Sequence, residues 1–148
     1  MERKLPNRSE VLIIGGGICG LMAAENLMFR GIDTIILEKS HGVGGRMATR
    51  RIENGVFDHG AQFITVRHSP FDEKIKELHK TGDVGLWCHG FHHQDGHPRY
   101  YGTRGMTTIL KNFAQNNEIR LQERVIRFAP QNDLWQVWTQ AGKEYVSR

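Results

Sequence analysis

The most constraining feature of this sequence is a glycine-rich turn that directly follows a short apolar run. Residues 11–14 (VLII) are typical of a buried parallel strand, and Gly15, Gly17 and Gly20 follow them in the spacing G-x-G-x-x-G. Apolar residues then recur at helical spacing until Gly31, namely Leu21, Ala24, Leu27 and Met28. A second β-branched run occupies residues 34–37. Strand, turn, helix and strand predict one βαβ unit with a right-handed crossover.

Each glycine of this turn has a physical role in holding a dinucleotide. Gly15 permits the tight turn, Gly17 lets the backbone approach a pyrophosphate, and Gly20 lets helix and strand pack closely. Free N–H groups at the helix start would bind the phosphates. Glu38, at the end of the second apolar run, would accept hydrogen bonds from the ribose hydroxyls and would repel the 2′-phosphate of NADP. The predicted cofactor-binding residues here are Gly15, Gly17, Ile18, Cys19, Gly20, Glu38 and Lys39. The alternative is a glycine turn that holds no ligand.

The chain contains two cysteines, Cys19 and Cys88, which are too few for a disulfide framework. A reducing, cytoplasmic setting is therefore expected. Cys19 at a helix N-terminus could be a reactive thiol. We favour the other interpretation, that its position requires a small side chain beside a phosphate.

Composition excludes several classes of protein. With 148 residues, 39% hydrophobic and 24% charged, the chain can form a soluble globular domain with its own core. No apolar run approaches the roughly 20 residues of a membrane span, and the polar residues 1–10 lack the apolar stretch of a signal peptide. The net charge of +4 is spread along the chain without a nucleic-acid motif, so we expect a small-molecule substrate and neither nucleic acid nor membrane as partner.

The rest of the chain predicts alternating strands and helices. Residues 40–51 are expected to form a loop, and Ala141-Gly142 is expected to turn a hairpin. The predicted strands are 56–57, 62–66, 119–128, 134–138 and 144–146, the predicted helices are 71–80 and 106–113, and residues 85–103 are expected to contain strands and turns.

A second glycine motif distinguishes FAD from NAD. Residues 41–49 (HGVGGRMAT) resemble the R-x-G-G-R-x-x-T/S motif of FAD enzymes in the glutathione-reductase-like, amine-oxidase branch, with His41 as one departure. In physical terms, Gly44 and Gly45 let a loop lie against the cofactor, and Arg46 supplies a bidentate cation for the diphosphate. The alternative is a solvated basic loop. FAD is therefore the predicted cofactor.

A wider resemblance covers nearly the whole chain, from Val11 to about Val137. Residues 42–51 (GVGGRMATRR), 57–63 (FDHGAQF), 95–100 (DGHPRY) and 105–107 (GMT) resemble the N-terminal half of renalase-like flavoproteins, a subgroup of the FAD-dependent amine oxidase superfamily. This resemblance implies an α/β fold, a Rossmann-like FAD/NAD(P)-binding domain of glutathione-reductase type with part of an inserted β-rich substrate domain. It further implies that Gly60, Ala61, Gln62 and Phe63 pass beside the isoalloxazine ring and that the backbone of Val125, after a strand-like stretch 120–123, contacts adenine.

The resemblance also implies an activity. Such enzymes oxidise a small reduced substrate by hydride transfer to FAD and pass the electrons to oxygen as peroxide, and renalases act on isomers of dihydronicotinamide dinucleotides. No catalytic acid or base can be named from this sequence. Two further hypotheses remain open, a non-catalytic FAD- or nucleotide-binding module and an amine or carotenoid-type oxidoreductase with a different substrate.

The chain differs from these enzymes in its length. Enzymes of this kind are roughly twice as long, in keeping with a cofactor domain and a discontinuous substrate domain. They also carry a late Gly-Asp motif, whereas Thr81-Gly82-Asp83 follows an amphipathic helix and is interpreted as a helix-ending turn. We therefore expect a C-terminally truncated product, a fragment, or half of a split enzyme whose partner is a separate C-terminal half. The predicted organisation is a polar tail (1–10), the FAD-binding βαβ and second glycine motif (11–84), a partial substrate-domain insertion (85–104) and a return to the FAD-binding domain (105–148).

Other groupings of chemically active residues are interpreted as structural. The cluster of Cys88 and four histidines lacks the paired spacing of a zinc site and is taken as a polar turn, with a metal-binding protein as a weak alternative. Its histidines are His89, His92, His93 and His97. Asp58 and His59 are expected to point to opposite faces of a strand, and Trp135 and Trp138 are expected to pack on a sheet.

Overall fold

The computed structural model describes residues 7–91 and 96–148, which divide into two compact units. The first comprises Met1–Gly45, described from residue 7, together with Phe113–Arg148, and the second is Arg46–Asn112. The predicted division at residues 84 and 104 stays a prediction. No helix among the described residues is long and apolar enough to cross a bilayer.

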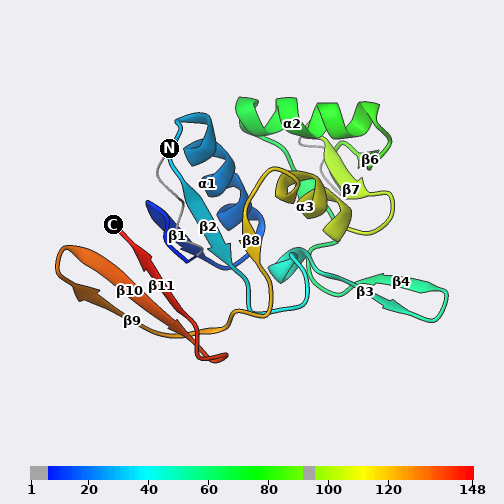
Figure 1. Ribbon diagram of the computed structural model, residues 1–148. Coiled ribbons are helices and arrows are strands. Elements are labelled where there is room, and N and C mark those ends of the chain that lie inside the picture. The colour runs from blue at the N-terminus through cyan, green and yellow to red at the C-terminus, as the bar shows by residue number, and fades with distance from the viewer. Residues whose placement is uncertain (1–6, 92–95) are drawn as a thin grey trace. The chain divides into compact units, whose positions relative to one another are not determined.

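The first unit contains the predicted βαβ element, which is confirmed (Figure 1). Strand β1 (Val11–Ile14) pairs in parallel with β2 (Thr34–Leu37), and helix α1 (Ile18–Phe29) connects them. The short strand β8 (Ile119–Arg120) adds on the far side of β2, giving the order β1-β2-β8. Gly31, at φ +73°, follows the last turn of α1 as expected, because its left-handed backbone lets the N–H of Ile32 bond back to the carbonyl of Leu27.

A second sheet in this unit is antiparallel. It has the order β11-β10-β9, formed by β9 (Val125–Gln131), β10 (Leu134–Thr139) and β11 (Glu144–Ser147). The predicted hairpin around Gly142 joins β10 to β11 and is confirmed. The tighter hairpin between β9 and β10 was not predicted. It turns on Asn132 and Asp133, both at positive φ (48° and 60°), as a two-residue turn of this kind requires.

The prediction of one strand over residues 119–128 is wrong. The chain leaves β8 after Arg120 and begins β9 only at Val125, so the stretch 120–123 is not a strand either. Gln122 sits in the left-handed region at φ +61°, and its N–H donates to the carbonyl of Ser40. The N–H of Glu123 donates to the carbonyl of Glu38. These contacts with a distant part of the chain, which local periodicity does not encode, break the strand.

The core of the first unit lies on both faces of β2. Parallel register places Leu12 and Ile14 on the same face as Ile35 and Leu37, and this face packs against Val137 and Tyr145 of the second sheet. The opposite face packs against α1, whose Leu21 and Ala24 are fully buried. Because the sheet is covered on both faces, the consecutive residues Ile35, Ile36 and Leu37 of β2 are all apolar.

The second unit begins with a short 3-10 turn, η1 (Gly45–Met47), followed by a hairpin. Strand β3 (Thr49–Ile52) pairs with β4 (Gly55–Asp58). The prediction that residues 40–51 form only a loop is therefore wrong at its end. The signal is weak there because Arg50, Arg51 and Ile52 are all exposed, so β3 has no apolar alternation.

The remaining elements of the second unit agree with the sequence. Helix α2 (Ser69–Lys80) is amphipathic and buries Ile75, and helix α3 (Thr107–Ala114) begins in this unit. A three-stranded antiparallel sheet has the order β5-β7-β6 and consists of β5 (Ile64–Thr65), β6 (Val84–Cys88) and β7 (Arg99–Gly102). The predicted strands near 56–57 and 62–66 and within 85–103 are thus confirmed.

A buried carboxylate stabilises the turn before β9. Glu123 is 3% exposed and accepts a hydrogen bond from the half-exposed ammonium of Lys143. Burial alone would raise the pKa of Glu123, but the hydrogen bond from Lys143 and that ammonium's charge lower it overall. A lowered pKa means that the ionised pair contributes stability above the unfolded pKa of about 4.5, and that this contribution is lost as pH falls through the folded pKa.

We therefore expect Lys143→Met to lower the midpoint of urea denaturation at pH 7, because it leaves a buried carboxylate without its partner. The deficit should shrink as the pH falls through the lowered folded-state pKa of Glu123, because a protonated carboxyl no longer needs the charge of Lys143. Lys76→Met is the matched control, since the pair of Lys76 with Asp72 is exposed on α2 and should leave the midpoint almost unchanged. A pH-independent deficit, or one equal to the control's, would contradict this account.

Candidate functional site

The glycine turn after β1 has the geometry that close approach of backbone segments requires. Gly15 lies at φ +108°, and its N–H donates to the carbonyl of Leu37 at 2.9 Å. A Cβ placed on Gly20 would lie 2.2 Å from the carbonyl oxygen of Gly15 and 3.2 Å from Ile13 Cγ2. Only glycine at this position lets α1 start so near the strand.

The N-terminus of α1 faces open space. Gly17 is the N-cap residue in extended conformation (φ −83°, ψ 176°), and a Cβ placed on it would meet no atom within 4 Å. Among the described residues, no side chain caps this helix end. The backbone N–H groups of Ile18 and Cys19 at the helix start are therefore available to an anion, and the Cys19 side chain is exposed.

Glu38 follows β2 and is held as an anion beside the turn. Glu38 as a residue is 6% exposed, and its Oε2 accepts from the N–H of Gly16 and its Oε1 from the N–H of Ser40, both at 2.7 Å. Burial raises the pKa of Glu38, but these two backbone hydrogen bonds outweigh it and lower the pKa overall. Each oxygen keeps further acceptor capacity, which a ribose hydroxyl could use. Lys39, next along the chain, is exposed.

The start of the second glycine motif lies directly against the first. The N–H of Gly44 donates to the carbonyl of Gly16 at 3.1 Å. Gly45 lies at φ +55°, and a Cβ placed on it would be 3.4 Å from Gly17 Cα. The glycines of both motifs therefore form one continuous backbone surface.

The segment before β9 reaches the same place. Because the N–H of Glu123 donates to the carbonyl of Glu38, Val125 at the start of β9 lies near the end of β2, partly buried. The first unit thus brings together ten of the predicted cofactor residues, which are Gly15, Gly17, Ile18, Cys19, Gly20, Glu38, Lys39, Gly44, Gly45 and Val125. Their role in binding a cofactor stays a prediction.

The other predicted cofactor residues belong to the second unit. The backbone of Arg46 is tied to Gly60-Ala61, because the N–H of Ala61 donates to its carbonyl at 2.8 Å. A Cβ on Gly60 would lie 2.1 Å from that same oxygen, so this contact needs glycine. The Arg46 side chain itself is exposed.

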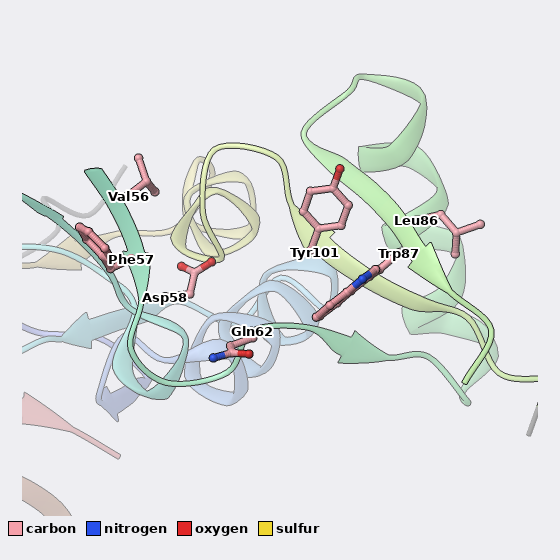
Figure 2. Close-up of a pocket in the computed structure, with 7 residues that line it drawn as sticks. All are labelled: Val56, Phe57, Asp58, Gln62, Leu86, Trp87 and Tyr101. Carbon is pink, nitrogen blue, oxygen red and sulfur yellow. The ribbon is translucent and has the colours of Figure 1, made fainter. Parts of the chain in front are cut away.

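Gln62 lines an apolar hollow of about 680 Å³ within the second unit (Figure 2). Trp87 and Tyr101, from the paired strands β6 and β7, stand on one side of it, and Phe57 and Asp58 of β4 stand on the other. Val56 and Leu86 complete the lining. Phe63 lies beside this hollow and packs edge-on against Trp87, with ring centroids 5.8 Å apart.

The sequence did not single out Trp87, Tyr101 or Phe57 as site residues. For Trp87 and Tyr101 the only available signal was the aromatic content of residues 85–103, which has no helical period. The pairing of β6 with β7 brings these two residues together, and that pairing is not visible in local sequence. Phe57 belongs to the separate hairpin of β3 and β4.

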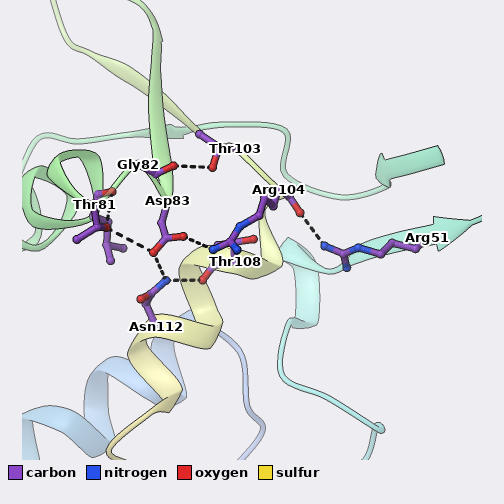
Figure 3. Close-up of polar contacts among 9 residues, drawn as sticks. Arg51, Thr81, Gly82, Asp83, Thr103, Arg104, Thr108 and Asn112 are labelled. Atoms are coloured by element: carbon purple, nitrogen blue, oxygen red, sulfur yellow. Dashed lines mark hydrogen bonds and ion pairs between the residues drawn. The ribbon is translucent and has the colours of Figure 1, made fainter. Parts of the chain in front are cut away.

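Thr81-Gly82-Asp83 is a helix-ending turn, as predicted (Figure 3). Gly82 lies at φ +79°, and the N–H of Asp83 bonds back to Leu78 of α2. The Asp83 carboxylate forms an ion pair with Arg104 and accepts from the Asn112 amide at 3.3 Å. The aspartate therefore connects elements of the second unit and has a structural role there.

Asp58, considered in the sequence for acid–base chemistry, is held by hydrogen bonds within the second unit. Asp58 Oδ1 accepts from the Thr49 hydroxyl at 2.6 Å and from the N–H of Met106 at 2.9 Å. Within the described ranges, no three His, Cys, Asp or Glu residues come together to hold a metal ion. His92 and His93 of the predicted polar turn lie outside those ranges.

Trp138 packs on the antiparallel sheet, as expected. Its indole N–H donates to the Glu144 carboxylate at 3.1 Å, and the Arg127 guanidinium lies 4.6 Å from the ring centroid. Trp135 contacts the ring of Phe128, with the two centroids 5.9 Å apart.

The chain is similar to known nucleotide-binding and flavin-containing proteins. Residues 13–81 match the family described as NAD(P)-binding Rossmann-like domain. Flavin-containing amine oxidase B of Mus musculus is 27% identical over 97% of this chain, and flavin-containing amine oxidase A of Sus scrofa is 40% identical over 52% of it. The chain spans about a quarter of the length of the mouse relative.

A solved structure of putrescine oxidase matches 95% of this chain, with a TM-score of 0.66 and 12% identity. The match covers 56% of the putrescine oxidase chain. At that identity the likeness shows the fold alone. The fold is a Rossmann-like α/β domain, and the matched residues correspond to part of the putrescine oxidase chain.

Proposed function

We propose that this chain forms the FAD-binding portion of an oxidoreductase of the amine oxidase superfamily, of the renalase-like subgroup. The observation that carries the proposal is the uncapped start of α1, open at Gly17, beside a buried and ionised Glu38. This arrangement offers backbone N–H groups to a diphosphate and a carboxylate to a ribose. The flavin-containing relatives support FAD as the dinucleotide.

The residues present fit such a cofactor. The N–H groups of Ile18 and Cys19 would bind the diphosphate, Gly44 and Gly45 would lie against it, and Glu38 would orient the adenosine ribose. Val125 would contact adenine through its backbone, and Arg46 would add positive charge near the phosphates. FAD, when bound, would accept a hydride from a reduced substrate and pass two electrons to oxygen, giving peroxide.

In the second unit, the hollow beside Gln62 has the chemistry to receive a planar organic group. Its walls are the rings of Phe57, Trp87 and Tyr101, with Gln62 and Asp58 as polar contacts. Aromatic walls with a few polar groups are typical of small-molecule sites. We propose that this hollow contributes to the substrate side, and that dihydronicotinamide dinucleotide isomers are the first substrates to test. Two alternatives stay open, a flavin amine oxidase with another substrate and a truncated module that binds FAD without catalysis.

The decisive measurement is titration of the purified chain with FAD, followed by flavin fluorescence. We expect saturable quenching at one FAD per chain and no competition from NADP⁺, because Glu38 would repel a 2′-phosphate. Absence of saturable binding would overturn the proposal. Peroxide release on adding dihydronicotinamide isomers, or instead on adding amines, would then separate the two enzyme hypotheses, and binding without peroxide would favour the module.

A further inference from the structure

A second hollow of the second unit has a basic lining. It measures about 440 Å³, which lies within the range of small-molecule sites. It shares no described lining residue with the hollow beside Gln62. Five of the side chains that line it carry or can carry a positive charge, namely Arg67, His68, Lys76, His89 and His97.

The fold gathers this charge from separate elements. Arg67 stands in the segment between β5 and α2, Lys76 lies on α2, and His89 follows β6. Asp72 is the one carboxylate among the described lining residues, and it forms an ion pair with Lys76. In the described part of the chain, Arg67 has no such partner. The hollow therefore keeps an excess of positive charge.

One buried side chain of the lining has a hydroxyl without a partner. Tyr100 is only 7% exposed, yet it lines the hollow. Its ring packs edge-on against the ring of His79, with the centroids 6.0 Å apart. Within residues 7–91 and 96–148, its hydroxyl makes no hydrogen bond. Buried phenols normally find a polar partner, so this open donor indicates a ligand that supplies an acceptor.

The start of α2 adds further donors to the same hollow. His68 is the N-cap residue, and no side chain of the described residues caps this helix end. The N–H groups of Phe71 and Asp72 both donate to the His68 carbonyl, and Pro70 has no N–H. The N–H and the hydroxyl of Ser69, which lines the hollow, are therefore available to an anion at the positive end of the helix.

We infer that this hollow binds a phosphate group, either free or carried by a small molecule. The Arg67 guanidinium would bind it in bidentate fashion, and the Tyr100 hydroxyl and the Ser69 N–H would donate to its other oxygens. Lys76 and the imidazole N–H groups would add further donors. A phosphate offers more acceptor oxygens than a carboxylate, and so it suits donors that come from several elements. The inference does not depend on FAD, because these residues belong to the second unit.

The test titrates the full chain with inorganic phosphate while NMR follows the backbone amides. Chloride replaces phosphate in the matched titration at the same ionic strength. We expect saturable shifts at Ser69, His89 and Tyr100 with phosphate, both with and without FAD, and none with chloride. Glycerol phosphate should give the same shifts. Tighter binding of glycerol phosphate would identify an ester as the ligand, and tighter binding of inorganic phosphate would identify the free ion.

Two variants test the donors separately. Arg67→Gln should weaken phosphate binding at least about tenfold, because it removes a charged bidentate donor. Tyr100→Phe keeps the ring and removes only the hydroxyl, and it should weaken binding about threefold or more. Arg50→Gln is the matched control, because Arg50 is exposed on β3 outside this lining and should leave the affinity unchanged. Circular dichroism of each variant separates lost binding from lost folding.

Three results would overturn the inference. The first is the absence of saturable shifts at Ser69 and Tyr100 up to about 10 mM phosphate. The second is equal weakening by Arg50→Gln and Arg67→Gln, which would assign the effect to net charge. The third is a set of shifts confined to Ile18 and Cys19, which would assign phosphate binding to the start of α1 in the first unit.

Discussion

Gly20→Ala should lower the free energy of unfolding by about 1–3 kcal/mol and abolish measurable FAD binding. The added Cβ would lie 2.2 Å from the Gly15 carbonyl oxygen, so α1 must move away from the strand and carry its N-terminus with it. Urea denaturation followed by circular dichroism measures the first effect, and flavin fluorescence titration measures the second.

Gly17→Ala tests FAD binding without changing how α1 packs against the sheet. Its φ of −83° suits alanine and no atom lies within 4 Å, so stability should change by less than about 0.5 kcal/mol. FAD affinity should nevertheless fall at least about tenfold, because the methyl group would occupy space proposed for the diphosphate. If Gly17→Ala kept the wild-type affinity for FAD, the diphosphate would have to bind elsewhere. If Gly20→Ala kept the wild-type stability, α1 would be able to move away from β1 with little loss of free energy.

Glu38→Gln should have the second largest effect. The amide keeps the shape of the carboxylate but turns one acceptor into a donor that faces a backbone N–H of Gly16 or Ser40. A buried hydrogen bond lost in this way costs about 1–3 kcal/mol at pH 7. We expect FAD affinity to fall at least about tenfold as well, since the ribose loses a charged acceptor.

The stability effect of Glu38→Gln should depend on pH in a defined direction. The folded-state pKa of Glu38 is lowered from its ordinary 4.5, so its contribution is complete above that value and is lost as pH falls through the folded pKa. Wild type and Glu38→Gln should therefore converge in stability as the pH falls through this lowered pKa. Glu73→Gln, at an exposed position on α2, should leave FAD affinity unchanged. A difference that persists undiminished at low pH would mean that ionisation of Glu38 is not the cause.

The βαβ element could be predicted because its signals are local. A β-branched run, glycines at fixed spacing, helical periodicity and Gly31 all lie within residues 11–37, and each agrees with the others. The same holds for the hairpin at Gly142 and for α2. In contrast, β3 was missed because its exposed residues show no alternation, and the break at Gln122 was missed because bonds to Glu38 and Ser40 cause it.

In the candidate site, too, the sequence predicts residues with a local signal and misses those that distant segments bring together. Glu38 was predicted from its place after the second strand, yet the two backbone N–H groups that fix its carboxylate were not. Trp87 and Tyr101 stand together because β6 and β7 pair across a gap in sequence. Partners brought together by pairing of distant segments leave no mark in local composition.

The first unit is assembled from the two ends of the chain, and this has a consequence for the order of events during synthesis. The apolar face of β2 is covered by Val137 and Tyr145, which a ribosome would add some hundred residues after Ile35. Until then the nascent βαβ segment carries an uncovered apolar face, while the continuous stretch Arg46–Asn112 already holds all of its own contacts. We therefore expect the segment Arg46–Asn112 to fold before β9, β10 and β11 cover the apolar face of β2.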